Sequence, residues 1–279
     1  MKPTLDPRTS ETFGLALDGL TKAKARFVVA GAFALHAYTG LWRSTKDLDL
    51  SCRPEDSDEI LRNLEQLGFT THVEERHWLG KAHREGALVD VIWGCGNWAC
   101  FVDDRWFETA QEHDVLGSSV LVMSPEDLIL SKAYVAGRER FDGTDISHLL
   151  HACGPTIDWD LLIDRFADHW PLLLHYLVLY RFVYPEDRAR VPATLIHELS
   201  RRIGTDAEVR DGLSFRGPLL DRYGYLFDLD EHALTDPREL LAERAGLPLA
   251  AVRVRRQLDA EALREGRPYR YEKEAKGER

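Results

Sequence analysis

The 279-residue sequence predicts an α/β (α+β) fold, in which a small mixed sheet is flanked by helices and followed by an all-helical C-terminal domain. In the first half, short β-favouring runs alternate with segments of helical period, an order typical of a layered domain. Beyond about Pro155, long apolar helical stretches replace the strand signals. The chain length also suits two domains better than one. We therefore expect a first domain over 1–153, a helical domain over 154–260 and a charged, loosely held tail over 261–279.

The elements follow from local signals. Ser10 can cap a first helix that runs to about Ala25. Four strands are predicted from short runs rich in β-branched and aromatic residues: 27–30, 46–52, 69–73 and 87–93. Four further helices are predicted from apolar periodicity and from end signals such as Gly40, Gly68 and the Ser124-Pro125 start: 32–38, 55–67, 125–138 and 172–183, with a shorter one over 161–166.

Composition places the chain among ordinary globular proteins, with 44% hydrophobic and 30% charged residues. The net charge of −11 argues against a protein coated for non-specific nucleic-acid binding, although it leaves room for a local basic groove. Four scattered cysteines fit neither a disulfide scaffold nor a zinc site, so we expect them to be reduced. The polar N-terminus and the lack of a membrane-spanning apolar window predict a cytoplasmic protein without membrane contact.

The segment with the clearest chemistry contains Asp47 and Asp49, each followed by a leucine. In a strand, this alternation places both carboxylates on one face and both leucines in the core. The two acids would lie about 6.6 Å apart along the strand, where they repel each other unless a cation joins them. Oxygen ligands of this kind suit Mg²⁺. Asp90, an acid within the apolar run 87–93, is the candidate third ligand, because burial of an unpaired carboxylate is costly.

Plainer explanations stay open for each of these features. An acid-x-acid pair is more often a solvated strand face than a metal site, and Asp90 is compatible with a solvent-facing position. Gly31 lies between a predicted strand and a helix, where the backbone N–H groups of Ala32 and Phe33 could receive a phosphate, but a plain tight turn explains it equally well. The spaced glycines of a dinucleotide-binding fingerprint do not follow Gly31, so a Rossmann fold is disfavoured.

These residues together resemble a known family. The first motif of the nucleotidyltransferase superfamily, in particular of the branch of AbiEii-type toxins and related uncharacterised proteins, is similar to the run through Gly31, Arg43, Thr45, Asp47 and Asp49. In that motif a glycine opens a helix and an acid-x-acid strand holds the catalytic metals. Ala32 stands where the family has glycine or serine, so this chain lacks a hydroxyl at that position.

A second block, residues 132–146, supports the resemblance, because a helix lysine followed by arginine and aspartate recurs in the toxin-like branch. The resemblance implies that Lys132 contacts the triphosphate, a task that suits a compact ammonium group; a solvated helix lysine is the alternative. Arg138, Arg140 and Asp145 would divide phosphate or acceptor contact, helix capping and ion pairing among themselves, and the sequence does not assign these roles.

The implied activity is Mg²⁺-dependent transfer of a nucleoside monophosphate from a nucleoside triphosphate to an acceptor hydroxyl, with release of pyrophosphate. The implied catalytic and metal-binding residues are Asp47, Asp49 and Asp90, which would hold two Mg²⁺ ions, or Mn²⁺ in their place. Asp90 could also take the proton of the attacking hydroxyl. The implied nucleotide-binding residues are Gly31, Ala32, Arg43, Thr45 and Lys132, although a loop salt bridge and a strand hydroxyl explain Arg43 and Thr45 equally well.

The acceptor stays open among an RNA such as tRNA, a protein and a small molecule. Two rival functions are also open. One is a non-catalytic nucleotide-binding or toxin–antitoxin interaction module, whose partner would be an antitoxin. The other is a metal-dependent phosphohydrolase that uses the same carboxylates with water as the nucleophile.

Overall fold

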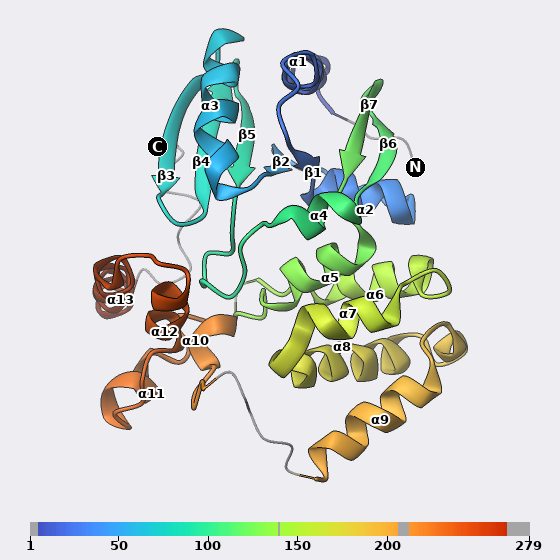
Figure 1. Ribbon diagram of the computed structural model, residues 1–279, viewed down its shortest axis with the longest axis vertical. Coiled ribbons are helices and arrows are strands. Elements are labelled where there is room, and N and C mark those ends of the chain that lie inside the picture. Colours follow the sequence, from blue (N-terminus) through green and yellow to red (C-terminus); the bar gives the residue numbers. More distant parts are fainter. Residues whose placement is uncertain (1–4, 139, 206–211, 267–279) are drawn as a thin grey trace.

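The computed structural model describes residues 5–138, 140–205 and 212–266. Within these residues, seven strands form one mixed sheet of order β3-β4-β5-β2-β1-β7-β6 (Figure 1). The strands are β1 (Val28–Val29), β2 (Asp47–Ser51), β3 (Thr70–Glu75), β4 (Leu79–Arg84), β5 (Ala87–Ile92), β6 (Gln111–Val115) and β7 (Ser118–Val122). The β2/β5 and β1/β7 pairs are parallel and the other neighbours are antiparallel, so the predicted mixed sheet is confirmed.

Helices surround this sheet, and they are the regular elements of the second half of the described chain. Their bounds are α1 (Pro7–Lys22), α2 (Gly31–Thr39), α3 (Ser57–Gln66), α4 (Asp104–Glu108), α5 (Pro125–Ala133), α6 (Gly143–Cys153), α7 (Trp159–Phe166), α8 (Trp170–Val183), α9 (Ala193–Ile203), α10 (Gly217–Leu220), α11 (Leu226–Glu231), α12 (Pro237–Arg244) and α13 (Leu249–Arg264). The predicted all-helical second half is confirmed for the described residues, because every strand of the sheet lies before Met123.

Local signals explain where the helices begin and end. Helix α1 begins at Pro7, because the Asp6 side chain accepts a hydrogen bond from the Thr9 amide at 3.0 Å. The expectation that Ser10 caps this helix was therefore wrong. Helix α2 ends at Gly40, whose φ of +69° is a left-handed cap, and α5 begins where Ser124 accepts from the Asp127 amide, both as predicted.

One face of the sheet is covered by α3. This helix contacts β3, β4 and β5, and it lies over them in Figure 1. Its apolar side, with Ile60 and Leu64, packs on strand residues such as Val89 and Val91, which are fully buried. Every second residue of β5 therefore points into this core, and the residues between them point to the opposite face.

Strands β4, β6 and β7 were not predicted, and tight turns explain them. Strands β4 and β5 form a hairpin around Glu85 and Gly86, and β6 and β7 form one around Leu116 and Gly117. All four turn residues have positive φ, between +51° and +89°, as two-residue hairpin turns require. The pairs Glu-Gly and Leu-Gly are weaker signals than Asn-Gly, so the polar strand β4 went unrecognised.

The helices of the second half pack on both the sheet and one another. Helix α6 contacts α2, α5 and α8, and α7 contacts α5, so helices on either side of residue 153 share buried contacts (Figure 1). The division into domains at residue 153 stays a prediction. Helix α5 ends at Ala133, earlier than the expected Arg138, and an isolated bridge between Ala136 and Phe141 follows it.

A second, smaller core joins the C-terminal helices to the first half of the chain. It contains Trp98, from the loop after β5, with Ala242 of α12 and Val252 of α13. Within the predicted tail, residues 261–264 belong to α13, whereas 267–279 lie outside the described residues. None of the described helices combines the length and the apolar character needed to cross a membrane.

The cysteine prediction was wrong for one pair. Cys95 and Cys100 form a disulfide in the loop after β5. Their Cα atoms are 5.5 Å apart because the loop turns back on itself, and Gly94 bridges Phe101. Cys52 and Cys153 are free and buried.

Candidate active site

Strand β2 positions the two predicted carboxylates. Leu48 and Leu50 are fully buried, and Asp47 and Asp49, which alternate with them, lie partly buried on the other face. The predicted alternation is therefore what the structure contains. The backbone carbonyl of Asp49 also accepts a hydrogen bond from the Ala30 amide at 2.9 Å, which ties β2 to the residue before α2.

The parallel neighbour strand β5 brings Asp90 to the same place. Asp49 pairs with Asp90 and Asp47 pairs with Leu88 in the β2/β5 register. Register partners on adjacent strands point to the same face of a sheet. Asp47, Asp49 and Asp90 therefore share the face opposite α3, as the sequence-based hypothesis requires.

Burial and mutual repulsion destabilise negative charge in this group. Burial raises the pKa of Asp49 well above its usual range, and the charges of Asp47 and Asp90 raise it further, whereas Lys132 and Arg140 act in the opposite direction. Burial likewise raises the pKa of Asp90. A proton or a cation would therefore relieve the unfavourable negative charge on Asp49 and Asp90.

The donor set fits Mg²⁺ in its chemistry, although the side chains are not gathered around a common point. In the described part of the chain, no three His, Cys, Asp or Glu side chains stand close enough together to hold a metal ion. Thr45 Oγ1 donates to Asp47 Oδ1 at 2.5 Å, and Lys81 Nζ donates to Asp90 Oδ1 at 3.1 Å. Carboxylate oxygens of like charge on one face are ligands that suit a hard cation. Asp47, Asp49 and Asp90 would hold a Mg²⁺ ion once the ion replaces Thr45 and Lys81 as the partner of these carboxylates.

Gly31 lies directly against the acidic strand. Its φ is +57°, and a Cβ built there would lie 1.7 Å from Asp49 Oδ2. Alanine or any larger residue would therefore collide with the carboxylate. Gly31 is also the first residue of α2, whose N-terminus has no side-chain cap. The amides of Gly31, Ala32 and Phe33 have no partner within the helix, because the first amides of any helix lack one.

Lys132 lies in a buried ion cluster. Its Nζ donates to Asp142 Oδ2 at 3.0 Å and to Asp145 Oδ2 at 2.7 Å, and its side chain is 11% exposed. Arg43 Nη2 also donates to Asp145 Oδ2, at 2.7 Å, while most of the Arg43 side chain stays exposed. Arg140 pairs with Asp142. Asp145 thus pairs with a lysine and an arginine, one of the roles that the sequence left open, and a phosphate contact by Lys132 stays a prediction.

Lys81 is a residue that sequence analysis missed. It belongs to β4, and it faces Asp90 in the β4/β5 register. A signal was present: counting backwards and forwards from the Glu85-Gly86 turn pairs residue 81 with residue 90. Recognition of the turn would therefore have placed a lysine beside the third carboxylate.

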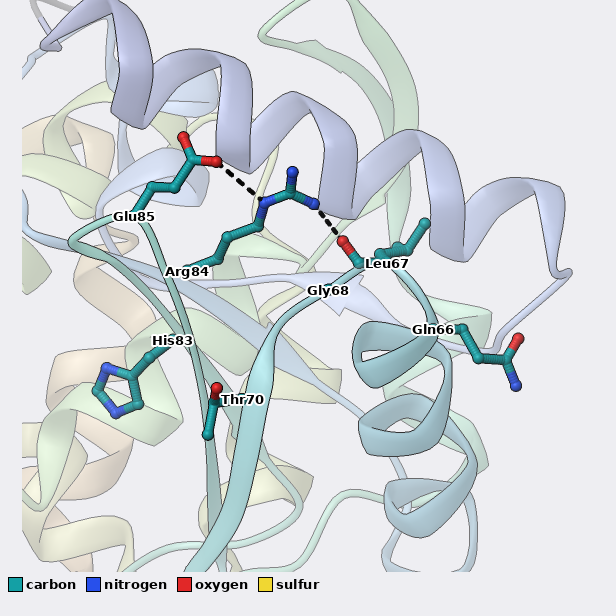
Figure 2. A pocket seen from close by; sticks show the side chains of 7 residues that line it. All are labelled: Gln66, Leu67, Gly68, Thr70, His83, Arg84 and Glu85. Carbon is teal, nitrogen blue, oxygen red and sulfur yellow. Dashed lines mark hydrogen bonds and ion pairs between the residues drawn. The ribbon is translucent and has the colours of Figure 1, made fainter.

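A shallow hollow lies at the outer part of the sheet, where α3 ends and β3 begins. Figure 2 shows the Arg84 side chain between the Glu85 carboxylate and the Leu67 carbonyl, with Gln66 and His83 at its margins. Its remaining lining residues are Gly68 and Thr70. Asp47, Asp49 and Asp90 do not line it.

Several solved structures share features with this chain. The antibiotic-resistance factor ANT(2'')-Ia is 20% identical, with 62% of this chain and 98% of that chain covered, at a TM-score of 0.46. An antigenic nucleotidyltransferase-like protein from Paracoccidioides brasiliensis is 16% identical, with 71% and 100% covered, at 0.48. A putative nucleotidyltransferase from Thermotoga maritima is 18% identical, with 44% and 81% covered, at 0.35. These likenesses are too distant to inform substrate or mechanism.

The family assignment comes from the sequence itself. No curated protein matches the chain. Residues 31–180, more than half of the 279, match the family described as uncharacterised nucleotidyltransferase. The match begins at Gly31 and includes β2, β5 and the Lys132 cluster, so it contains every residue proposed for the site. The AbiEii-type branch is not identified and stays a prediction, but the chain belongs to the uncharacterised nucleotidyltransferase family.

Proposed function

We propose that this chain transfers a nucleoside monophosphate from a nucleoside triphosphate to an acceptor hydroxyl in a Mg²⁺-dependent reaction that releases pyrophosphate. The observation that carries the proposal is the β2/β5 register, which sets Asp49 opposite Asp90 with Asp47 on the same face. These three acids would hold two Mg²⁺ ions, or Mn²⁺. The bound ions would neutralise phosphate charge and lower the pKa of the attacking hydroxyl.

The triphosphate would lie at the N-terminus of α2. Gly31 lets the start of α2 lie directly against the Asp49 carboxylate, and the Ala32 amide is among those from which an anion can accept a hydrogen bond. Lys132 and Arg43 would supply positive charge, which each shares with Asp145. Thr45 orients the Asp47 carboxylate through its hydrogen bond.

In the transfer step, the acceptor oxygen forms a bond to the α-phosphorus, and the bond from that phosphorus to the pyrophosphate oxygen breaks. The Asp90 carboxylate takes the hydroxyl proton, because burial raises its pKa and makes it a better base than a solvated aspartate. An RNA such as tRNA, a protein or a small molecule could each provide the hydroxyl. A cytoplasmic location stays a prediction.

One observation favours a second candidate, a non-catalytic nucleotide-binding or toxin–antitoxin interaction module. Lys132 is already satisfied by two carboxylates, and the three predicted ligands are not gathered into a metal site in the described chain. A module of this kind would bind a nucleotide, or an antitoxin, without turnover.

The experiment that separates these functions is a label-transfer assay. The protein is incubated with Mg²⁺ and each α-labelled nucleoside triphosphate, with and without total cellular RNA. We expect label on RNA, protein or a small molecule, together with free pyrophosphate. Label released only as free nucleoside monophosphate would identify a phosphohydrolase, and nucleotide binding without turnover would favour the interaction module.

Isosteric variants supply the controls. Asp49→Asn removes a charge from the site while it keeps the shape of the side chain, so transfer should fall to background. Asp58→Asn makes the same change at an exposed position on α3 and should leave transfer unchanged. Equal transfer by both variants would rule out the carboxylate site as the source of the activity.

A further inference from the structure

The face of the sheet that carries the carboxylates continues beyond Asp90 to the outer edge of the sheet. Asp90 pairs with Lys81 on β4, and Lys81 pairs with His72 on β3. The register therefore forms one transverse row, Asp49-Asp90-Lys81-His72, across four strands. All four side chains point to the face opposite α3, because cross-strand partners share a face.

A parallel row lies one pleat away. Asp47 pairs with Leu88, Leu88 with His83, and His83 with Thr70. His72 and His83, one from each row, stack with their rings at 2° and their centroids 5.6 Å apart. At spacings of about 4.8 Å per strand, the two rows extend roughly 14 Å from the β2 acids to β3.

This extension is open to solvent. His72, His83 and Thr70 are exposed, and Lys81 and Leu88 are partly exposed, whereas Ala82 on the other face of β4 is fully buried. We call the surface formed by Lys81, His83, His72 and Leu88 the β4 strip. Leu88 lies between its basic side chains and Asp47. The β4 strip carries one ammonium and two imidazole groups beside a small apolar surface, and Glu74, which bonds His72 at 3.0 Å, closes it at the outer strand.

The two sides of the carboxylates are chemically different. Gly31 and the uncapped start of α2 lie against Asp49, on the side assigned to the triphosphate. The β4 strip lies on the Asp90 side, from which the second reactant must approach. Lys81 is held by Asp90 Oδ1 at 3.1 Å. When Asp90 gives its charge to a cation, the Lys81 ammonium becomes available to a new anion.

We propose that the β4 strip is the acceptor-binding surface, and that it takes an acceptor that carries a phosphate group near its reacting hydroxyl. This rests on the proposed function, whose acceptor it specifies. Lys81 and His83 bind the phosphate, and Leu88 supports the sugar or base beside it. A single-stranded RNA end and a small sugar phosphate both provide this chemistry.

Direct binding tests the assignment. A fluorescein-labelled short single-stranded RNA with a 3′ hydroxyl is titrated with the full-length protein, in Mg²⁺ and a non-hydrolysable nucleoside triphosphate, and its anisotropy is recorded. Lys81→Met should weaken binding about tenfold, the loss of one charge-assisted hydrogen bond. The double variant His72→Gln, His83→Gln changes only exposed side chains and should weaken binding in the same direction. Lys22→Met, at an exposed position at the end of α1, should leave binding unchanged.

Competition distinguishes the two sources of phosphate. Displacement of the RNA by ribose 5-phosphate at millimolar concentration would identify a small sugar phosphate as sufficient, and resistance to it would identify the polynucleotide. Both results support the β4 strip, provided that Lys81→Met weakens the interaction. Lys81→Arg keeps the charge and should restore most of the affinity.

Other results would overturn the assignment. If the wild type bound neither probe, or if Lys81→Met and the double-histidine variant bound RNA as the wild type does, the β4 strip would not be the acceptor surface. Binding of a fluorescent nucleoside triphosphate, measured in parallel, keeps this failure separate from that of the proposed function. Intact nucleotide binding with an unaltered RNA affinity rejects only the strip, whereas absent nucleotide binding rejects the transferase.

Discussion

Replacing Gly31 with alanine should disturb the acidic site more than the fold. Gly31 has a φ of +57°, and a Cβ there would lie 1.7 Å from Asp49 Oδ2. The left-handed conformation costs an alanine about 1–2 kcal/mol, equivalent to a fall in Tm of about 2–8 °C for a chain of this size. The Asp49 carboxylate must also move aside. We expect this displacement to weaken Mg²⁺-dependent binding of a nucleoside triphosphate by about tenfold or more, since misplacement by about 1 Å has large effects in such sites.

Gly40→Ala is the matched control. Gly40 has a φ of +69°, but a Cβ there would meet open space among the described residues. Both variants place an alanine in the left-handed backbone conformation and should lose stability for that reason, but only Gly31→Ala displaces Asp49. Thermal denaturation measures the shared cost, and isothermal titration with Mg²⁺ and a nucleoside triphosphate measures the difference. Equal nucleotide affinities for the two variants would refute the role given to the contact between Gly31 and Asp49.

Three further predictions concern buried charges and thiols. Lys132→Met should lower the free energy of unfolding, measured by urea denaturation, by about 3–5 kcal/mol. The reason is that Asp145, which is 1% exposed, loses its buried cation. A loss below about 1 kcal/mol would contradict this. Burial lowers the pKa of His77 to about 4, so the unfolded chain takes up this proton first as the pH falls. The free energy of unfolding should therefore fall by up to about 3 kcal/mol between pH 6.5 and 4. His77→Phe keeps a ring against Trp98 and should make the unfolding free energy depend less steeply on pH in this range. An unchanged pH dependence would count against the role of His77. Burial raises the pKa of Cys52 to about 12, so iodoacetamide at pH 8 should modify it only after denaturation, as mass spectrometry can establish.

Particular elements explain how far sequence reasoning reached. Strand β2 was predicted because Asp47 and Asp49 alternate with two leucines, and α5 was predicted because Ser124 and Pro125 are strong local start signals. Strand β4 carries lysine, histidine and arginine, which are all at least partly exposed, so it lacks the apolar pattern of a buried strand. The disulfide between Cys95 and Cys100 depends on a loop conformation that spacing alone does not specify.

The same distinction between local signals and tertiary packing applies to the candidate site. The sequence by itself indicated the candidate residues: the two acids of β2, the acid within an apolar β5, and a glycine at the start of α2. Only the tertiary structure decided that Asp49 stands opposite Asp90, that the Asp49 carboxylate occupies the space beside Gly31, and that Lys132 is neutralised by two carboxylates. Alternation and capping act over a few residues and can be read from their order. Strand register and ion pairing depend on distances between residues far apart in the chain, which are set only when the sheet and helices pack together.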